Sequence, residues 1–232
     1  MSSSYQLQQR MLARIRASLG RSVGRSAPEK LPLFAGQVSA NGNGRLDAEF
    51  ESEIEKVGGR IARVCSSQEV TAYLESLLPA DEKISVAISD GSLIEELRIG
   101  ESLACKTCVV RWPKATRSIE DYKRELLGCG IGITCADYAL ADTGTVVLLS
   151  GREHHRLISL LPPVHVCLLP VERIVPSLPA LLDHLSDQSY SQERPPHALT
   201  CITGPSRTAD IEQQITTGVH GPKALHVLLY SN

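Results

Sequence analysis

From residue 46 onwards, segments with helical periodicity alternate with short apolar segments that are typical of strands. The first of them are Leu46–Val57, Arg60–Val64, Gln68–Leu78, Ile84–Ile88, Leu93–Ile99, Thr107–Val110 and Ile119–Leu126. Later strands are predicted over Ile131–Thr134, Val146–Leu149, Val166–Leu169, Ala198–Ile202 and Leu225–Tyr230, and a helix over Pro176–Leu185. Repeated strand–helix units form a parallel sheet, because each crossover lays a helix against it. We therefore predict an α/β fold with a Rossmann-like, mostly parallel sheet and flanking helices.

The first 44 residues have a different character from the rest. Residues 5–19 carry apolar side chains at helical spacing and basic or polar side chains toward the other face, which predicts an amphipathic helix. Residues 20–44 are rich in Gly, Ser, Pro, Ala and Asn, which is typical of an extended or mobile linker. We expect an N-terminal helix and linker over residues 1–44 and one main domain over residues 45–232. The helix is a candidate for docking on a partner, and packing on its own domain is the alternative.

Charge and hydropathy exclude several classes of function. The chain of 232 residues has a net charge of −2 and provides no broad basic surface, which argues against nucleic-acid binding. Apolar runs stay well short of the roughly 20 residues that span a bilayer, and the N-terminus lacks the apolar core of a signal peptide. We expect a cytoplasmic protein without a membrane span.

The cysteines predict reduced thiols. Their number, seven, is odd, and no secretory signal accompanies them. Cys105 and Cys108 form a C-x-x-C that leads into a strand and has no second pair to complete a four-ligand site, so a structural role is favoured. The other five suit small buried side chains; they are Cys65, Cys129, Cys135, Cys167 and Cys201.

The sequence lacks the motifs of the common cofactors and metal centres. Gly128, Gly130 and Gly132 are spaced G-x-G-x-G and lead into a strand, so the dinucleotide fingerprint fails. There is no phosphate-binding P-loop and no G-x-S-x-G nucleophile elbow. His154 and His155 are adjacent and cannot share one helix face, which argues against zinc. We expect no cofactor and no metal in this chain.

Polar residues beside a predicted buried strand mark the main candidate site, Ile133–Ser150. Small, hydroxylated and acidic residues stand next to the apolar run Val146–Leu149, and a turn at a strand end is a common place for a ligand. The candidates are Thr134, Asp137, Asp142, Thr143, Gly144 and Thr145, with Asp142 and Asp137 as the catalytic carboxylates. Asp, Thr and Gly are also ordinary turn residues, so a purely structural turn is the alternative.

Two further positions join this candidate site. Ser89 and Asp90 directly follow a predicted strand, where ligands collect in parallel sheets, although capping of the next helix is the favoured interpretation. Arg156 at a predicted helix start is suited to hold a carboxylate bidentately, and an ion pair with Asp142 or Glu153 is the alternative.

Residues 203–212 predict a strand end, a turn and a helix start. In this interpretation Ser206 caps the helix, and Arg207 and Thr208 hold an anion at its N-terminus. Gly204 shapes the turn, and the later loop with His220 lies close to it. A single pocket would then gather Thr134, Asp137, Asp142, Thr145, Arg156 and Arg207.

Two stretches of the chain resemble a known family. GITCADYALADTGTVVLLS followed by ISLLPPVHVCLLP, and ITGPSRTADIE with GVHGP, closely resemble the LUD domain of the lactate utilization protein C (LutC) family, over about Leu46 to Tyr230. The resemblance implies a NagB/RpiA/CoA-transferase-like fold and a role, with iron–sulfur partner proteins, in oxidising L-lactate to pyruvate. A stand-alone protein or enzyme that binds a small anion, a sugar phosphate or a CoA ester is the alternative. Asp142 stands where relatives of the family carry Glu, so the carboxylate is kept with a shorter reach.

Overall fold

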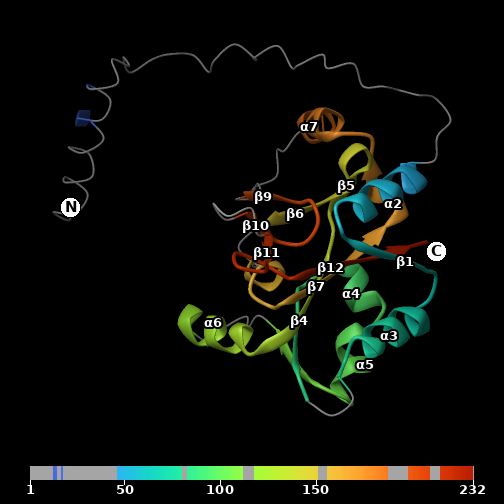
Figure 1. The fold of residues 1–232 in the computed structure, drawn as a ribbon, viewed down its shortest axis with the longest axis vertical. Helices are drawn as coiled ribbons and strands as arrows, with labels where there is room; N and C mark the ends of the chain where they lie inside the picture. The colour runs from blue at the N-terminus through green and yellow to red at the C-terminus, as the bar shows by residue number, and fades with distance from the viewer. Residues whose placement is uncertain are drawn as a thin grey trace. The chain divides into compact units, whose positions relative to one another are not determined.

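The structure is a computed structural model that describes residues 13, 14, 17, 46–79, 83–111, 118–150, 156–187, 198–209 and 215–231. The chain divides into two units, residues 1–36 and 37–232, and the second is the fold described below (Figure 1). Of the predicted N-terminal helix, only Ala13, Arg14 and Ala17 are described, and they are helical. The rest of that helix, and the predicted linker over residues 20–44, lie outside the described residues.

A six-stranded parallel sheet forms the centre of the fold, in the order β1-β12-β7-β4-β2-β3. The strands are β1 (Arg60–Val64), β12 (Ala224–Tyr230), β7 (Val164–Pro170), β4 (Cys129–Cys135), β2 (Ser85–Ile88) and β3 (Cys108–Arg111). Each neighbouring pair is parallel. The central strands read as nearly continuous apolar runs because both of their faces are covered. The predicted α/β fold with a mostly parallel sheet is confirmed.

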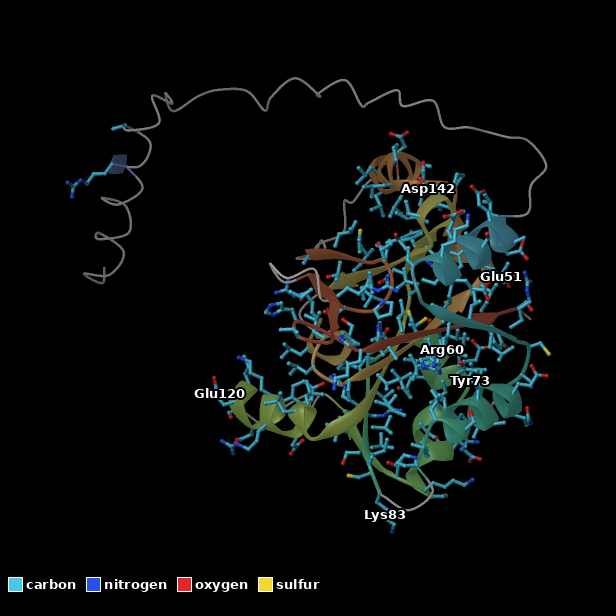
Figure 2. All side chains as sticks on the ribbon, viewed as in Figure 1. Glu51, Arg60, Tyr73, Lys83, Glu120 and Asp142 are labelled. Carbon is cyan, nitrogen blue, oxygen red and sulfur yellow. The ribbon has the colours of Figure 1, made fainter. Side chains whose placement is uncertain are left out.

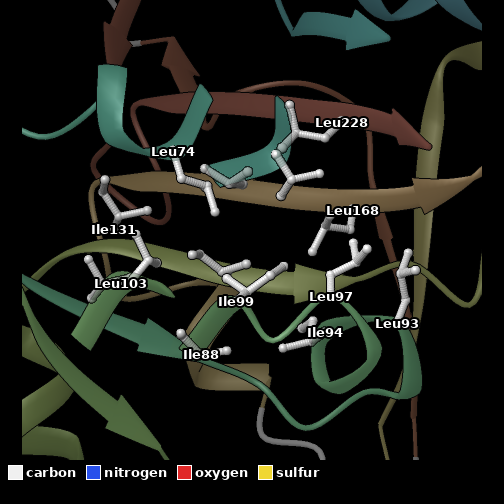
Figure 3. Packing of buried hydrophobic residues seen from close by; sticks show 14 of the residues in the cluster. Leu74, Ile88, Leu93, Ile94, Leu97, Ile99, Leu103, Ile131, Leu168 and Leu228 are labelled. Carbon is white, nitrogen blue, oxygen red and sulfur yellow. The ribbon is translucent and has the colours of Figure 1, made fainter. Parts of the chain in front are cut away.

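Three helices cover one face of this sheet: α3 (Ser67–Ser76), α4 (Ser92–Glu96) and α5 (Ile99–Ala104) (Figure 1). The hydroxyl of Tyr73, which is labelled on α3 in Figure 2, lies 2.9 Å from His226 Nδ1 of β12, and this contact ties the helix to the sheet. Figure 3 shows the apolar core between these helices and the strands. The predicted single segment Leu93–Ile99 is in fact two helices, because the chain turns at Arg98, whose φ is +52°.

The opposite face is covered by α2 (Leu46–Lys56), α6 (Ile119–Leu127) and a second sheet of four strands in the order β8-β5-β6-β9. These strands are β5 (Tyr138–Leu140), β6 (Thr145–Ser150), β8 (Ile174–Val175) and β9 (Ala198–Ile202). Phe50 and Ile54 of α2 are fully buried between the two sheets. Leu181 of α7 (Leu178–Asp187) packs on the other side of the second sheet. A separate second sheet was not predicted, since its strands are apolar on both faces and alternation gives no signal.

A short antiparallel pair replaces the helix that was predicted to start near Ser206. β10 (Arg207–Ala209) pairs with β11 (Ile215–Thr217), so this prediction is wrong. The β-branched run Ile215–Thr217 favours a strand, and pairing with it keeps Arg207 and Thr208 extended. Three short 3-10 helices complete the fold: η1 (Ala141–Thr143), η2 (Arg156–Ser159) and η3 (Val171–Arg173).

Two other predictions concern cysteines and membrane spans. All seven cysteines are free thiols, and Cys108 opens β3 as predicted. Cys129 and Cys167 are buried, whereas Cys65 and Cys201 are exposed, so burial was wrongly predicted for those two. Within the described part of the chain, no helix has the length and apolar character needed to cross a bilayer.

The connections of β2 and β4 open a crevice between them. After β2 the chain crosses to β3 by way of α4 and α5, on one face. After β4 it passes through the second sheet and η2, on the other face, and returns as β7 on the other side of β4. Neighbouring strands whose connections leave in opposite directions leave room beyond their carboxyl ends, where ligands bind in open parallel sheets.

Candidate functional site

A small pocket lies at this crevice, with a cavity volume of about 30 Å³. Its wall comes from the residue after β2, the end of β4, the end of β6 and the start of η2. The lining residues are Ser89, Thr134, Cys135, Asp137, Leu148, Leu149, Ser150 and Arg156. Three of the predicted site residues, Thr134, Asp137 and Arg156, are therefore brought together.

Thr134 is held by a histidine from the neighbouring strand. Its Oγ1 lies 2.8 Å from His165 Nε2, and both side chains are buried. His165 stands on β7 and pairs in register with Gly132 of β4. Burial lowers the pKa of His165 to about 3, because the protonated ring would lose its hydration, so the ring is neutral at physiological pH.

Asp137 closes the open end of the β5–β6 hairpin. Its Oδ2 accepts a hydrogen bond of 2.6 Å from the Leu149 backbone N–H, and its own N–H donates to the Val147 carbonyl at 3.0 Å. The carboxylate thus continues the strand ladder and at the same time lines the pocket. This predicted catalytic candidate has a structural bond as well as access to the site.

Ser89 lines the pocket instead of capping a helix. Helix α4 begins after Gly91, and no side chain caps it, so the favoured interpretation of Ser89 and Asp90 was wrong. The Ser89 N–H donates to the Ile133 carbonyl at 2.9 Å, which extends the β2–β4 pairing by one residue and fixes Ser89 at the pocket wall.

Arg156 begins η2, is exposed and lines the pocket. The described residues contain no ion pair between Arg156 and Asp142, and Glu153 lies outside them. The alternative of an ion pair between Arg156 and Asp142 is therefore wrong. The Arg156 guanidinium contributes a positive charge to a wall that also holds the Asp137 carboxylate, hydroxyls and apolar groups.

The turn with Asp142 lies at the other end of the hairpin, beside α2 and α7 (Figure 2). The Thr143 hydroxyl donates to Asp142 Oδ1 at 3.1 Å, and the Asp142 N–H donates to the Pro176 carbonyl at 3.1 Å. Gly144 adopts φ +59°, and a Cβ there would lie 2.6 Å from Ile54 Cα of α2. The glycine is thus required for close packing of α2 on the turn.

Thr145 connects this turn to the turn that begins at Thr203. Its Oγ1 lies 2.9 Å from Thr143 Oγ1 and 2.7 Å from Thr203 Oγ1. The prediction that Asp142, Thr145 and Arg207 share one pocket with Thr134 is wrong, since none of these three lines it. A turn at residues 142–145 was correctly predicted, but the length of the β5–β6 hairpin separates this turn from the pocket.

The predicted anion site at Gly204–Thr208 loses the helix on which it depended. Gly204 lies against the Val57 carbonyl, and the Arg207 guanidinium lies over Gly58. Ser206 is a turn residue and not a cap: its N–H donates to the Pro222 carbonyl, and its carbonyl accepts from the Gly218 N–H, both at 2.9 Å. Thr208 pairs with Thr216, and His220 is exposed. The two hydrogen bonds of Ser206 join the segments that precede β10 and follow β11.

Sequence reasoning missed His165 and the role of Cys135. A histidine within the apolar run Val164–Leu169 was the available signal for the first. Burial, and then the nearby Asp137 carboxylate, raise the pKa of Cys135 to about 11, so this thiol in the pocket wall stays protonated. Among the described residues, no group of three or more His, Cys, Asp or Glu is placed to hold a metal ion.

Comparisons with known proteins agree with this architecture. The LUD domain family model matches residues 48–230. Lactate utilization protein C of Halalkalibacterium halodurans is 47% identical over 92 residues, which is 40% of each chain. The protein of the same name from Anoxybacillus flavithermus is 33% identical over 168 residues, which is 71% of each chain. The uncharacterized protein YkgG of Escherichia coli is 36% identical over 146 residues, or 62% of each chain.

A solved structure has the same fold. The DUF162 family protein from Deinococcus radiodurans superposes with a TM-score of 0.56 at 22% identity, over 82% of this chain and all of that one. The matches to the Halalkalibacterium halodurans and Escherichia coli proteins span 40% and 62% of those proteins' own length. From the family model and these relatives together, the chain belongs to the lactate utilization protein C family of LUD domain proteins.

Proposed function

We propose that this chain is the ligand-binding component of an L-lactate utilization system that oxidises L-lactate to pyruvate together with iron–sulfur partner proteins. The pocket at the ends of β2 and β4 carries this proposal. It combines the guanidinium of Arg156 with the hydroxyls of Ser89, Thr134 and Ser150, and it is small. A carboxylate beside a hydroxyl or carbonyl oxygen is the chemistry that such a wall recognises, so a three-carbon acid suits it better than a whole sugar phosphate.

The reaction places limits on what this chain contributes. Conversion of lactate to pyruvate removes a proton from the hydroxyl, a proton from C2 and a pair of electrons. In our proposal the C2 proton and the two electrons leave to the partner proteins, whose clusters accept the electrons. In this proposal Arg156 binds the carboxylate, and Asp137, which lines the same pocket, takes the hydroxyl proton.

Growth on L-lactate tests the proposal. A bacterial host that lacks its own lactate utilization protein C is complemented with the wild type, with Arg156→Ala, or with Arg124→Ala. Arg124 is a matched control because it lies on α6, is largely exposed and pairs with Asp121 within the same helix. We expect growth with the wild type and the control, and poor growth with Arg156→Ala. Equal growth of all three strains would remove the pocket from the function.

Calorimetry on the purified chain separates the proposal from its alternative. We expect binding of L-lactate and pyruvate and none of coenzyme A; the opposite pattern would favour a CoA-ester protein. Purified alone, the chain should carry no iron and should oxidise lactate only after the partner proteins are added. Removal of residues 1–25 should weaken co-purification with those partners, and unchanged co-purification would exclude the N-terminal segment as the docking element.

A further inference from the structure

A buried histidine next to the pocket residue Thr134 has a ring nitrogen without a hydrogen-bond partner among the described residues. His165 is fully buried in β7, the third strand from one edge of the sheet, and its Nδ1 has no hydrogen-bond partner among the described residues. Its other nitrogen, Nε2, lies 2.8 Å from Thr134 Oγ1. Because Thr134 lines the pocket, the histidine is one residue removed from any ligand there.

The single proton of the neutral imidazole belongs on Nε2. If Nδ1 carried it, a strong N–H donor would be buried without an acceptor, and orphaned N–H groups are rarer in proteins than under-satisfied acceptors. With the proton on Nε2, the ring donates to Thr134 Oγ1, and Nδ1 remains a bare acceptor. The unpaired nitrogen therefore fixes the direction of the Thr134 hydrogen bond.

This direction leaves the hydroxyl proton of Thr134 available. The oxygen accepts from His165, so its own O–H must point elsewhere. In the structure the Thr134 hydroxyl donates to Cys167 Sγ at 3.6 Å, and a thiol sulfur is a weak acceptor. An oxygen of a ligand in the pocket competes well against this sulfur.

We propose that His165 is a positioning residue that holds Thr134 as a hydrogen-bond donor to the C2 oxygen of a 2-oxo or 2-hydroxy acid, whose carboxylate is bound by Arg156. This assignment rests on the proposed function. Arg156 and Thr134 line the same small pocket, so one three-carbon acid bound there would contact both. A carbonyl oxygen and a hydroxyl oxygen both accept, so product and substrate keep the contact, whereas an acid without a C2 oxygen loses it.

Calorimetry with matched acids tests the assignment of Thr134. The probes are pyruvate, L-lactate and propionate; propionate has the same carboxylate and carbon number but no C2 oxygen. We expect Thr134→Val to weaken pyruvate and L-lactate binding about tenfold, the usual worth of one hydrogen bond, and to leave propionate unchanged. Thr134→Ser keeps the hydroxyl and should bind all three like the wild type. An equal loss for propionate, or no loss for pyruvate, would overturn the assignment.

His165 is tested by a pair of variants and by a spectroscopic signature. A glutamine amide can place an N–H near the position of Nε2, so His165→Gln should keep most pyruvate binding, while His165→Leu should lose about tenfold. Nitrogen-15 spectra of the wild-type chain should show His165 neutral, with the proton on Nε2, between about pH 5 and 8. A proton on Nδ1 would overturn the proposal even if neither variant folded.

The two levels of the proposal fail in different ways. Loss of pyruvate binding in Arg156→Ala, together with full binding in Thr134→Val, would refute the role of Thr134 and His165 and leave the proposed function intact. Failure of the wild type to bind pyruvate or L-lactate would overturn both.

Discussion

Replacement of Gly132 by alanine should disturb the pocket from below. Gly132 lies in β4, and η2, which begins with Arg156, packs directly on it. A Cβ on Gly132 would lie 3.0 Å from Pro162 Cγ and 3.2 Å from the Ile158 carbonyl carbon, and closer still to the Ile158 carbonyl oxygen. Carbon atoms pack at about 3.5–4.0 Å, so η2 must move away from the sheet.

The size of the effect follows from this overlap. The obstacle is backbone and a proline ring, neither of which can swing aside as a flexible side chain would. Overpacking of this kind costs typically about 1–3 kcal/mol. For a chain of this length, a loss of about 2 kcal/mol lowers Tm by about 4–8 °C. Because Arg156 moves with η2, pyruvate binding should weaken as well.

Gly128→Ala is the matched control. Gly128 has φ −85°, which an alanine adopts readily, and a Cβ there would meet only the Glu125 carbonyl oxygen, at 3.4 Å. Thermal melts and calorimetry with pyruvate are compared for both variants. We expect Gly128→Ala to behave like the wild type. If Gly132→Ala also melted and bound like the wild type, η2 would not be anchored on β4, and the geometric account of the pocket would be refuted.

Three further predictions concern the Asp142 turn, Arg98 and His165. Asp142→Asn should melt and bind pyruvate like the wild type, since an amide oxygen still accepts the Thr143 hydrogen bond. The variant should nevertheless impair growth on lactate, because this exposed turn contacts a partner in our proposal. A change in its pyruvate affinity would contradict this prediction. Arg98→Gly should raise the free energy of unfolding by about 0.5–1 kcal/mol, because glycine relieves the left-handed conformation. Its ion pair with Glu101 is largely exposed and contributes little, so a destabilised variant in chemical denaturation would count against this account. Lowering the pH from 7 to 5 should lower the free energy of unfolding by about 2 kcal/mol through His165. The pKa of His165 in the folded chain lies near 3, below its value in the unfolded chain, so the unfolded chain binds the proton first. His226, whose pKa burial and Arg60 also lower, acts in the same direction, so the measurement is the difference between the wild type and His165→Gln, and an equal pH slope would refute the buried neutral ring.

The helices and strands were predictable because their signals are local. Helix α6 follows an apolar stripe with Ser118 as its cap, and β7 is a continuous apolar run. The failures lie where distant pairing decides. The segment from Ser206 has good helix-start residues, yet Arg207 pairs with Thr217 as a strand, and this partner lies ten positions along the chain. A local pattern contains no information on such a partner.

The candidate site divides for the same reason. Thr134 and Arg156 were chosen by residue type, and the topology of the sheet brings them to one pocket. Asp142 was chosen from the same stretch, but the pairing of Tyr138 with Val147 places it in the turn at the far end of the hairpin. Residues separated by five positions in the sequence, such as Asp137 and Asp142, therefore lie at opposite ends of a hairpin. Proximity along a chain predicts proximity in space only within one turn or one helix.

Two glycines show that a motif typical of ligand binding can instead serve the packing of the fold. Gly132 belongs to a G-x-G-x-G that suggests nucleotide binding, and Gly144 to a turn that suggests a ligand loop. In both cases the space that a side chain would fill is taken by protein backbone: η2 lies on Gly132, and α2 lies on Gly144. Only the first of these contacts reaches the pocket, since η2 carries Arg156. Glycine thus shapes this site indirectly, by letting a segment that bears the charged group approach the sheet.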